Sequence, residues 1–511
     1  MNNKADEVTA DTASYQRIFT STSIIGGASI VSILIGLVRV KLIAVLLGPA
    51  GVGLIGLYAA LMNTAATAAQ LGVGIVGTRQ IAEAHAKADA IQLAIARRAL
   101  FLAALALSMV GGLAVWLSRD QLARWVFDDP AAGGSVAWLA LGVALSVAAA
   151  SQSALIRGMR RVSELALITI FSAVLGAVIG VPLVWWLGQG GIAIFVVVAP
   201  ASAFVLGHVF VARLPKATPA NIATADLSAQ WKMLVRLGLP FMGSALAATA
   251  IGLWIRTDIQ RQLGAEALGN FEASWAIAMH YVGFVLGAMS ADYYPRLTGV
   301  IDKPADACRL VNQQTEVALL LSGCVILALL ALAPWVIALL YTAEFAEATV
   351  VLQWQALATV LKVASWPLGY VILAAGAGRK YFLTETVTLL LMAISISLLI
   401  PLFGLEAAGI GYLASYVFYL PLVYVLAVRS IGFGWSGKVK LSFGLLAGLG
   451  LVVFATNMLF PAGALLAAGL AMAIYGIFAV QLLSQMGLFV AFTEGHMWIR
   501  NFIKKPPGGT Q

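Results

Sequence analysis

Four cationic side chains lie inside long apolar runs of this sequence, where a charge is costly. Arg39 and Lys41 fall in the run that ends at the turn 48–53, Arg256 lies in a later run, and Lys362 lies in the middle of another. A charge at the centre of a membrane helix costs roughly 2.5–3.5 kcal/mol, so such residues usually face a cavity or the interior of a bundle. Buried cations form strong charge-assisted hydrogen bonds with anions such as phosphates. These four residues therefore predict a site for an anionic ligand.

A structural explanation stays open for each of these cations. Arg39 lies nine residues before Gly48, which is about 13 Å along a helix and far for a side chain to reach the interface. Lys41 is nearer the surface, and residues two apart point to nearly opposite faces of a helix, so both cannot enter one cavity. Lys362 would be structural if it paired with a buried carboxylate such as Glu272 or Glu385.

Three further polar residues in apolar runs, Glu272, His280 and Asp258, are candidates for binding a coupling ion or lining the cavity. Histidine and buried carboxylates can exchange protons near neutral pH, although a polar residue satisfied within the core is an equally good explanation. Asp258 and Arg261 are three residues apart, and this spacing predicts a local ion pair. Four tryptophans could stack on sugars, but aromatic residues in a helical bundle more often serve packing: Trp254, Trp275, Trp354 and Trp366.

The composition excludes most classes of soluble protein. Of 511 residues, 61% are hydrophobic and only 10% are charged, whereas a soluble domain has about 25% charged residues. The net charge of +9 therefore indicates loops of a membrane protein and not nucleic-acid binding. No loop is long enough for a catalytic domain, so we expect no enzyme. Neither cysteine has metal-site spacing, and GFGWSGK at 432–438 lacks the Ser or Thr that must follow the lysine of a nucleotide-binding loop, so we expect no cofactor.

The apolar runs predict fourteen membrane-spanning helices, because about 20 helical residues cross a bilayer. Polar helical stretches at 82–90, 226–235 and 304–313 are expected at the membrane surface. Nearly all lysines and arginines outside the spans lie in alternate loops, and the opposite side has only Arg119 and Arg124. The positive-inside rule therefore places both termini in the cytoplasm. The predicted spans are 21–47, 53–73, 94–117, 135–156, 164–187, 191–213, 236–261, 268–290, 315–340, 349–375, 382–403, 406–428, 439–459 and 463–485.

An internal repeat relates the two halves of the chain. LGPAGVG at 47–53 matches LGAEALG at 263–269, and the other matched positions likewise lie 216 to 218 residues apart. Each repeat holds six spans, so both copies have the same orientation, and an axis along the membrane normal relates them. Four parts follow: a six-helix bundle at 1–213, a cytoplasmic linker at 214–235, a second six-helix bundle at 236–428, and two extra helices with a basic amphipathic tail at 429–511. The other matches are 78–79 with 295–296, 157–161 with 375–379, and 191–193 with 409–411.

The predicted arrangement has two repeats of six spans followed by two extra spans. On it lie three short motifs that are similar to those of a known family. They are the turn LGPAGVG after the first span, YPRL at 294–297 and GRK at 378–380. With them the chain resembles the Wzx-type flippases, the O-antigen and lipid III translocases in the polysaccharide branch of the MATE-like MOP exporter superfamily. The resemblance implies an all-α, MATE-like polytopic membrane protein.

The same resemblance implies a function and a set of partners. The function is translocation of an undecaprenyl-diphosphate-linked oligosaccharide from the cytoplasmic to the periplasmic leaflet of a bacterial inner membrane, by alternating access. The partners are this substrate, membrane lipids, a polysaccharide polymerase and a chain-length regulator, with no nucleic acid.

Two other functions are alternatives to a flippase. A cation-coupled multidrug exporter on the same scaffold would favour buried carboxylates, because its substrates are often cationic, but here the deep cations outnumber the deep acids. A membrane enzyme such as an oligosaccharide polymerase would need a longer extracytoplasmic loop. We therefore predict that Arg39, Arg256 and Lys362, with Lys41, bind the diphosphate of a lipid carrier.

Overall fold

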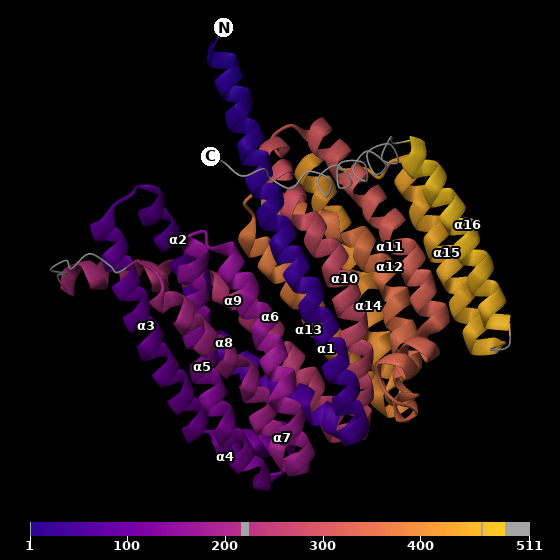
Figure 1. Ribbon diagram of the computed structural model, residues 1–511. Helices are drawn as coiled ribbons and strands as arrows, with labels where there is room; N and C mark the ends of the chain where they lie inside the picture. The colour runs from indigo at the N-terminus through magenta and orange to yellow at the C-terminus, as the bar shows by residue number, and fades with distance from the viewer. Residues whose placement is uncertain (1, 216–223, 461–462, 486–511) are drawn as a thin grey trace, which may run out of the picture. The chain divides into compact units, whose positions relative to one another are not determined.

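The computed structural model describes residues 2–215, 224–460 and 463–485, nearly all of them helical (Figure 1). Helix is the expected form, because a backbone in lipid must satisfy its own hydrogen bonds. The predicted basic tail at 489–505 and most of the predicted linker lie outside the described residues. The helices are α1 (Asn2–Gln70), α2 (Val73–Ala86), α3 (Ala90–Leu117), α4 (Arg119–Leu122), α5 (Gly133–Gly158), α6 (Val162–Val178), α7 (Gly180–Leu187), α8 (Ile192–Ala212), α9 (Thr224–Leu263), α10 (Ala265–Val300), α11 (Pro304–Leu340), α12 (Ala348–Ala374), α13 (Gly378–Phe403), α14 (Glu406–Ile431), α15 (Gly437–Leu459) and α16 (Ala464–Gln485).

Helix α1 consists of two helices that meet at Gly48. The backbone there has φ +62° and ψ −168°, a conformation open mainly to glycine, and Pro49 suits the first turn of the helix that follows. The matched turn between α9 and α10 also depends on a glycine, since Gly264 has φ +89°. The sequence placed a turn at 48–53; in the structure the break is confined to Gly48, and residues 49–53 already belong to the helix that follows.

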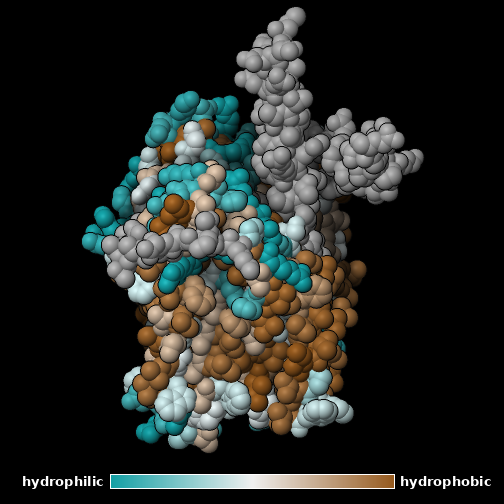
Figure 2. All heavy atoms as spheres, turned by 60° about the vertical axis from the view of Figure 1, so that its left-hand side comes forward, coloured by the Kyte–Doolittle hydropathy of each residue, from teal (hydrophilic) through white to brown (hydrophobic). Residues whose placement is uncertain are grey.

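Ten helical segments within the described residues are long and apolar enough to cross a membrane, or eleven if the bent pair Ala265–Gly287 and Asp292–Val300 forms one span. Two of the ten, Val31–Gln70 and Val162–Ala212, each cover the positions of two predicted spans. Figure 2 shows hydrophobic side chains in a broad band on one face, with hydrophilic ones above and below it. The chain is thus a multi-pass membrane protein, and the count of fourteen spans stays a prediction.

The contacts divide the chain into two compact units. Unit 1 comprises residues 1–273, 337–348 and 385–408. Within it α1 packs against α5, α6 and α9, and α5 also packs against α3 and α8. Large side chains such as Leu57, Ile81, Leu139 and Ile156 are fully buried there.

Unit 2 comprises residues 274–336, 349–384 and 409–511. Its core joins α10, α11, α12, α14, α15 and α16. The hydroxyl of Tyr475, on α16, donates to the carbonyl of Leu319 on α11 at 3.0 Å, and Gly323 leaves the space that its ring fills. The last two helices therefore belong to the core of unit 2, whereas the predicted division into two six-helix bundles stays a prediction.

Candidate functional site

Arg39 lies on α1 of unit 1, against α6 and α8. Its guanidinium carbon is 5.6 Å from the centre of the Phe195 ring, and a Cβ at Gly176 would lie 3.1 Å from its Nη1. A cation–π contact of this kind contributes roughly 0.5–2 kcal/mol. Among the described residues the guanidinium has no hydrogen-bond acceptor and no carboxylate partner. Its five N–H donors are therefore open to an anionic ligand.

Lys41 is engaged with the C-terminal end of α11, whose residues from 337 onward belong to unit 1. Its ammonium donates to the carbonyl of Ala338 at 3.0 Å and to that of Tyr341, at the C-terminal end of α11. The last carbonyls of a helix lack intrahelical partners and carry a partial negative charge, which a lysine satisfies. Arg39 and Lys41 thus have separate surroundings, in line with their spacing of two residues.

Arg256 and Glu272 form an ion pair between α9 and α10 within unit 1. Arg256 Nε donates to Glu272 Oε1 at 2.5 Å and Nη2 donates to Oε2 at 3.2 Å, while Nη1 donates to the carbonyl of Gly252. The two side chains are only 15% and 14% exposed. Two parallel charge-assisted hydrogen bonds fix both the distance and the orientation of the groups. This pair occupies the carboxylate that was a possible partner for Lys362.

The Glu272 carboxylate is packed closely by small and aromatic residues. A Cβ at Gly56 would lie 2.4 Å from the Glu272 carboxylate carbon, so a larger residue there would displace the carboxylate from this position. Burial raises the pKa of Tyr341, just beyond the end of α11, and the nearby negative charge of Glu272 raises it further. Tyr341 is therefore a neutral hydroxyl beside the ion pair.

Two glycines allow the matched turns of the sequence repeat to touch. A Cβ at Gly53 would lie 2.5 Å from the carbonyl oxygen of Ala265, and one at Gly269 would lie 1.8 Å from that of Pro49. In the sequence repeat, Gly53 corresponds to Gly269 and Pro49 corresponds to Ala265. The contact is thus reciprocal. Gly53 of the first turn meets Ala265 of the second, and Gly269 of the second turn meets Pro49 of the first.

The prediction of an ion pair between Asp258 and Arg261 is wrong, because each side chain has another partner. Asp258 Oδ1 accepts from the side chain of Gln262 at 2.8 Å. Arg261 Nη2 donates to the carbonyls of Arg124 and Trp125, at 3.3 and 2.6 Å. These carbonyls belong to the short π-helix Ala123–Phe127, where a distorted helix end offers acceptors that compete with a carboxylate. Asp258 Oδ2 is buried without a hydrogen-bond partner among the described residues.

Lys362 lies on α12 of unit 2 in an aromatic environment. Its ammonium donates to the hydroxyl of Tyr412 at 3.1 Å and lies 3.5 Å from the sulfur of Met279. It is also 5.8 Å from the ring centres of both Tyr412 and Tyr416. No carboxylate among the described residues is within ion-pair distance of it. Lys362 therefore carries a charge that its neighbours solvate but do not neutralise.

The tryptophans and His280 are mostly engaged in packing or local bonds. Trp275 meets Tyr412 edge to face at 5.6 Å, and Trp354 lies 4.4 Å from Phe454. His280 is exposed, and its Nδ1 lies 2.6 Å from the carbonyl of Ala276, so Nδ1 is the donor and Nε2 is left for another partner.

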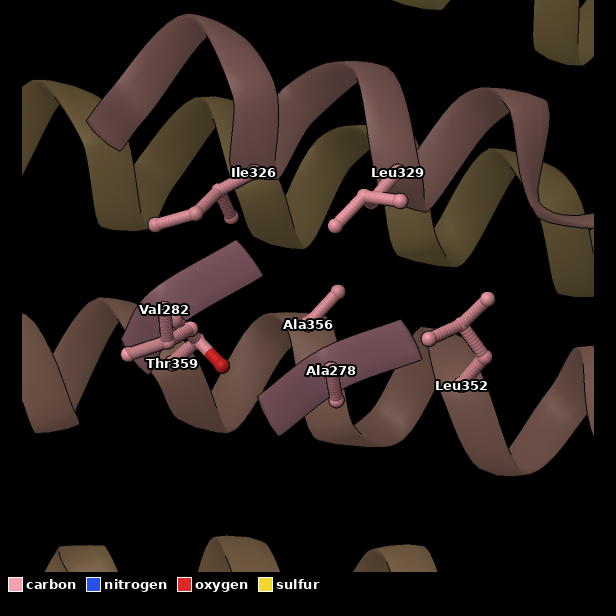
Figure 3. A pocket seen from close by; sticks show the side chains of 7 residues that line it. All are labelled: Ala278, Val282, Ile326, Leu329, Leu352, Ala356 and Thr359. Carbon is pink, nitrogen blue, oxygen red and sulfur yellow. The ribbon is translucent and has the colours of Figure 1, made fainter. Parts of the chain in front are cut away.

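Figure 3 shows a pocket inside unit 2 that is lined in part by α12, the helix that carries Lys362. It has no room for a water molecule. Thr359 is its one polar side chain, and its hydroxyl donates to the carbonyl of Gln355 at 2.7 Å. This pocket is a packing defect of the core and offers no ligand site. Its lining residues are Ala278, Val282, Ile326, Leu329, Leu352, Ala356 and Thr359.

The GFGWSGK stretch serves helix capping. The Ser436 hydroxyl accepts from the backbone N–H of Val439 at 3.3 Å, and the Ser436 N–H donates to Asn312 on α11 at 2.7 Å. This segment therefore ties the start of α15 to α11. The described residues contain no group of three or more His, Cys, Asp or Glu that could hold a metal ion.

Sequence reasoning missed the tyrosines that surround Lys362. Tyr412 and Tyr416 are four residues apart on α14, so they share one face of that helix. That spacing was a usable signal, but nothing in the sequence linked this face to a lysine on α12. Which helices face one another is a tertiary property.

Comparisons with known proteins agree with this architecture. The family described as "Polysaccharide biosynthesis protein" matches residues 18–300, more than half of the chain. The lipid III flippase of Escherichia coli (strain K12) is 23% identical over 406 residues, which cover 77% of this chain and 94% of the relative, and that of Shigella flexneri gives the same values.

Solved structures share the fold at low sequence identity. A multidrug resistance MATE family transporter of the MOP superfamily, in an inward-facing conformation, matches 78% of this chain and 94% of its own, with a TM-score of 0.67 and 17% identity. The lipid II flippase MurJ, in an inward closed conformation, matches 90% and 99%, with a TM-score of 0.62 and 13% identity.

Proposed function

Because this chain belongs to the polysaccharide biosynthesis protein family, we propose that it is a flippase for a lipid-linked oligosaccharide. Its substrate is an oligosaccharide on undecaprenyl diphosphate, which it moves from the cytoplasmic to the periplasmic leaflet of the inner membrane by alternating access. The product serves assembly of O-antigen or a related surface polysaccharide. The relatives named lipid III flippase support a lipid-linked sugar as the class of substrate.

The observation that carries this proposal is that two of the cations within the membrane have no carboxylate partner in the described part of the chain, whereas the buried carboxylate Glu272 has one. Arg39 in unit 1 and Lys362 in unit 2 have no carboxylate partner among the described residues, whereas Glu272 is already bound by Arg256. A desolvated charge without a partner is unfavourable, so each free cation favours an anionic ligand. A diphosphate supplies that charge.

The other two predicted cations have protein partners. Arg256 holds Glu272, and Lys41 holds the carbonyls at the end of α11. A role for either in binding the diphosphate stays a prediction, and it would require the substrate to replace these contacts. Arg39 and Lys362 can each bind an anion without breaking an ion pair, so we assign contacts with the diphosphate during its passage to each of them separately.

A multidrug exporter is the second candidate, and one observation favours it. Asp258 has a buried carboxylate oxygen without a partner, and a cationic drug or a coupling ion could bind there. Such an exporter would depend on Asp258 and tolerate loss of Lys362, which is the opposite of the flippase dependence.

The parallel six-helix repeats remain part of this proposal. The reciprocal contacts of Gly53 and Gly269 are those expected if a local two-fold axis passes between the matched turns. Six spans per repeat give both turns the same orientation in the bilayer.

The decisive experiment measures translocation directly. Purified full-length protein is reconstituted into vesicles that contain a fluorescent oligosaccharide on undecaprenyl diphosphate, and the leaflet of the label is read by quenching from outside. We expect movement between leaflets that protein-free vesicles lack. Asp258→Asn and Lys362→Ala distinguish the two candidates: loss of movement with Lys362→Ala supports the flippase. Export of a cationic dye that needs Asp258, without lipid movement, would refute it.

A further inference from the structure

An apolar pocket opens in unit 1 where α3 meets the first part of α9. Its volume is about 110 Å³, and its lining has no polar surface. An apolar cavity of roughly 150 Å³ in another protein stays dry and binds benzene, so this one suits a short length of hydrocarbon chain. The residues that line it from these two helices are Ala103, Ala106, Leu107, Trp231, Leu234 and Val235.

Specific contacts hold the first part of α9 over this pocket. Trp231 Nε1 donates to the carbonyl of Ala99 on α3 at 3.1 Å, and Gln80 Nε2 on α2 donates to the carbonyl of Gln230 at 3.2 Å. A Cβ at Gly238 would lie 2.1 Å from the carbonyl oxygen of Leu71, so the helix also approaches the end of α1 closely. The pocket is thus built by fixed contacts on both sides.

The residue types around the pocket are those of a membrane–water interface. The stretch 226–235 is the polar segment that the sequence placed at the membrane surface. Tryptophan is enriched at this level of a bilayer, and lysine and arginine extend their charged ends from it toward water. Figure 2, which brings the side of α3 in Figure 1 forward, shows hydrophilic side chains bordering the hydrophobic band.

The charged residues of α3 and of residues 227–257 of α9 are all positive. Lys232 and Arg236 are exposed on α9 next to the lining residues, and Arg97 and Arg98 lie on α3. Neither α3 nor the segment 227–257 of α9 contains an acidic residue. A zwitterionic phospholipid would gain little from such a surface, whereas a diphosphate brings more than one negative charge to a single headgroup.

From this juxtaposition we infer that the pocket binds the first isoprenoid units of the lipid carrier, with its diphosphate at Lys232 and Arg236. The inference rests on the proposed function and adds a docking site to it. The apolar lining encloses the start of the isoprenoid chain and shields it from neighbouring lipids, and the cations favour the diphosphate headgroup. A substrate held here is in the leaflet where translocation starts.

A photolabelling experiment tests this site without any transport step. The probe is a polyprenyl diphosphate with a diazirine on its first isoprenoid units, applied to the full-length protein in nanodiscs. We expect labelling within 103–107 and 231–235 that excess unlabelled polyprenyl diphosphate removes and excess phosphatidylglycerol does not. Equal competition by phosphatidylglycerol would show a site for bulk lipid and overturn the inference, as would labelling only elsewhere.

Two sets of variants separate the chain from the headgroup. Ala106→Phe fills the pocket and should weaken probe binding about tenfold, whereas Ala114→Phe, at another exposed position on the same helix, should leave it unchanged. Lys232→Gln with Arg236→Gln should remove the preference for diphosphate over monophosphate and leave the pocket intact, so it tests the site even if Ala106→Phe fails to fold. An unaltered preference, or equal effects of the two phenylalanine variants, would contradict the inference. Vesicles that flip substrate without this labelling would refute the pocket alone, and labelling without flipping would refute the function alone.

Discussion

The intramembrane cations differ in what neutralises them. Arg256 shares its charge with Glu272 through two hydrogen bonds, and Lys41 satisfies the end of α11. Arg39 rests on the face of Phe195, and Lys362 bonds to a tyrosine hydroxyl. Aromatic faces and hydroxyls stabilise a cation less than a carboxylate does, because they carry no full negative charge. The two cations in aromatic surroundings can thus bind an anion without breaking an ion pair.

Lys362→Ala should reduce translocation by about 10- to 100-fold, the effect of losing one hydrogen bond to a charged group. The fold should lose only about 1 kcal/mol, because no carboxylate is left unpaired. Lys362→Arg should retain part of the activity. The measurements are the rate of flipping in vesicles and the amount of folded membrane protein, with Lys380→Ala as a control at an exposed cation. Normal flipping by Lys362→Ala would remove this residue from the site.

Arg256→Ala should destabilise the protein by about 3–5 kcal/mol, because Glu272 would remain as a buried charge without its partner. Replacing both residues, as in Arg256→Leu with Glu272→Leu, should restore most of that loss, since no unpaired charge remains. Thermal unfolding of the purified variants measures both effects. If the double variant is as unstable as the single one, the ion pair is not what Arg256 contributes.

At the residue scale the sequence predicted which side chains carry charge in the membrane but not their partners. Arg256 and Glu272 lie on successive helices, and their contact depends on how α9 and α10 are joined at Gly264. The Asp258–Arg261 pair failed for a similar reason, because helical spacing alone ignores acceptors that another helix supplies. The carbonyls of the π-helix 123–127 were such acceptors.

At the scale of elements, glycine determines where helices of unit 1 approach most closely. Gly269→Ala should destabilise the protein by about 1–3 kcal/mol, as overpacking does, because a Cβ would lie 1.8 Å from the carbonyl oxygen of Pro49. Gly36→Ala on α1 is the matched control, since a Cβ there meets nothing within 4 Å. That control should be neutral or slightly stabilising. The melting temperatures of the two variants decide the matter, and equal values would show that the turns can separate freely.

The element boundaries followed the sequence well where glycine and proline were decisive. The sequence placed a break at 48–53, where a proline follows a glycine, and the positive φ values at Gly264 and Gly404 are at or near other predicted ends. The pocket between α3 and α9 had no such signal. It arises because α9 continues without a break from its polar first part into its apolar part, which places Trp231 over α3.

At the scale of the whole molecule, the sequence predicted an all-helical membrane protein and its family, and both are confirmed. Hydrophobicity and helix length are local properties, so a bilayer imposes them on each segment independently. The matched turns of the sequence repeat share glycines and predict two related bundles, and that arrangement stays a prediction. The arrangement of the bundles depends on many weak contacts that no short motif encodes.

The membrane topology is the last prediction, and it follows from charge. Lysine and arginine are enriched in short cytoplasmic loops. Nearly all of those outside the predicted spans lie in loops on one side of the membrane. Reporter fusions at Gly48, Gly190 and Gly404 should therefore read as periplasmic, and fusions at Arg161 and Arg379 should read as cytoplasmic. Gly48 and Gly404 lie at breaks between helices, and Arg161 precedes α6. Alkaline phosphatase and fluorescent protein fusions give opposite signals on the two sides, so each position is measured twice. A reversed pattern at any two positions would refute the topology. It would also change the leaflet from which the substrate is taken, because the cations beside the α3–α9 pocket would then face the periplasm.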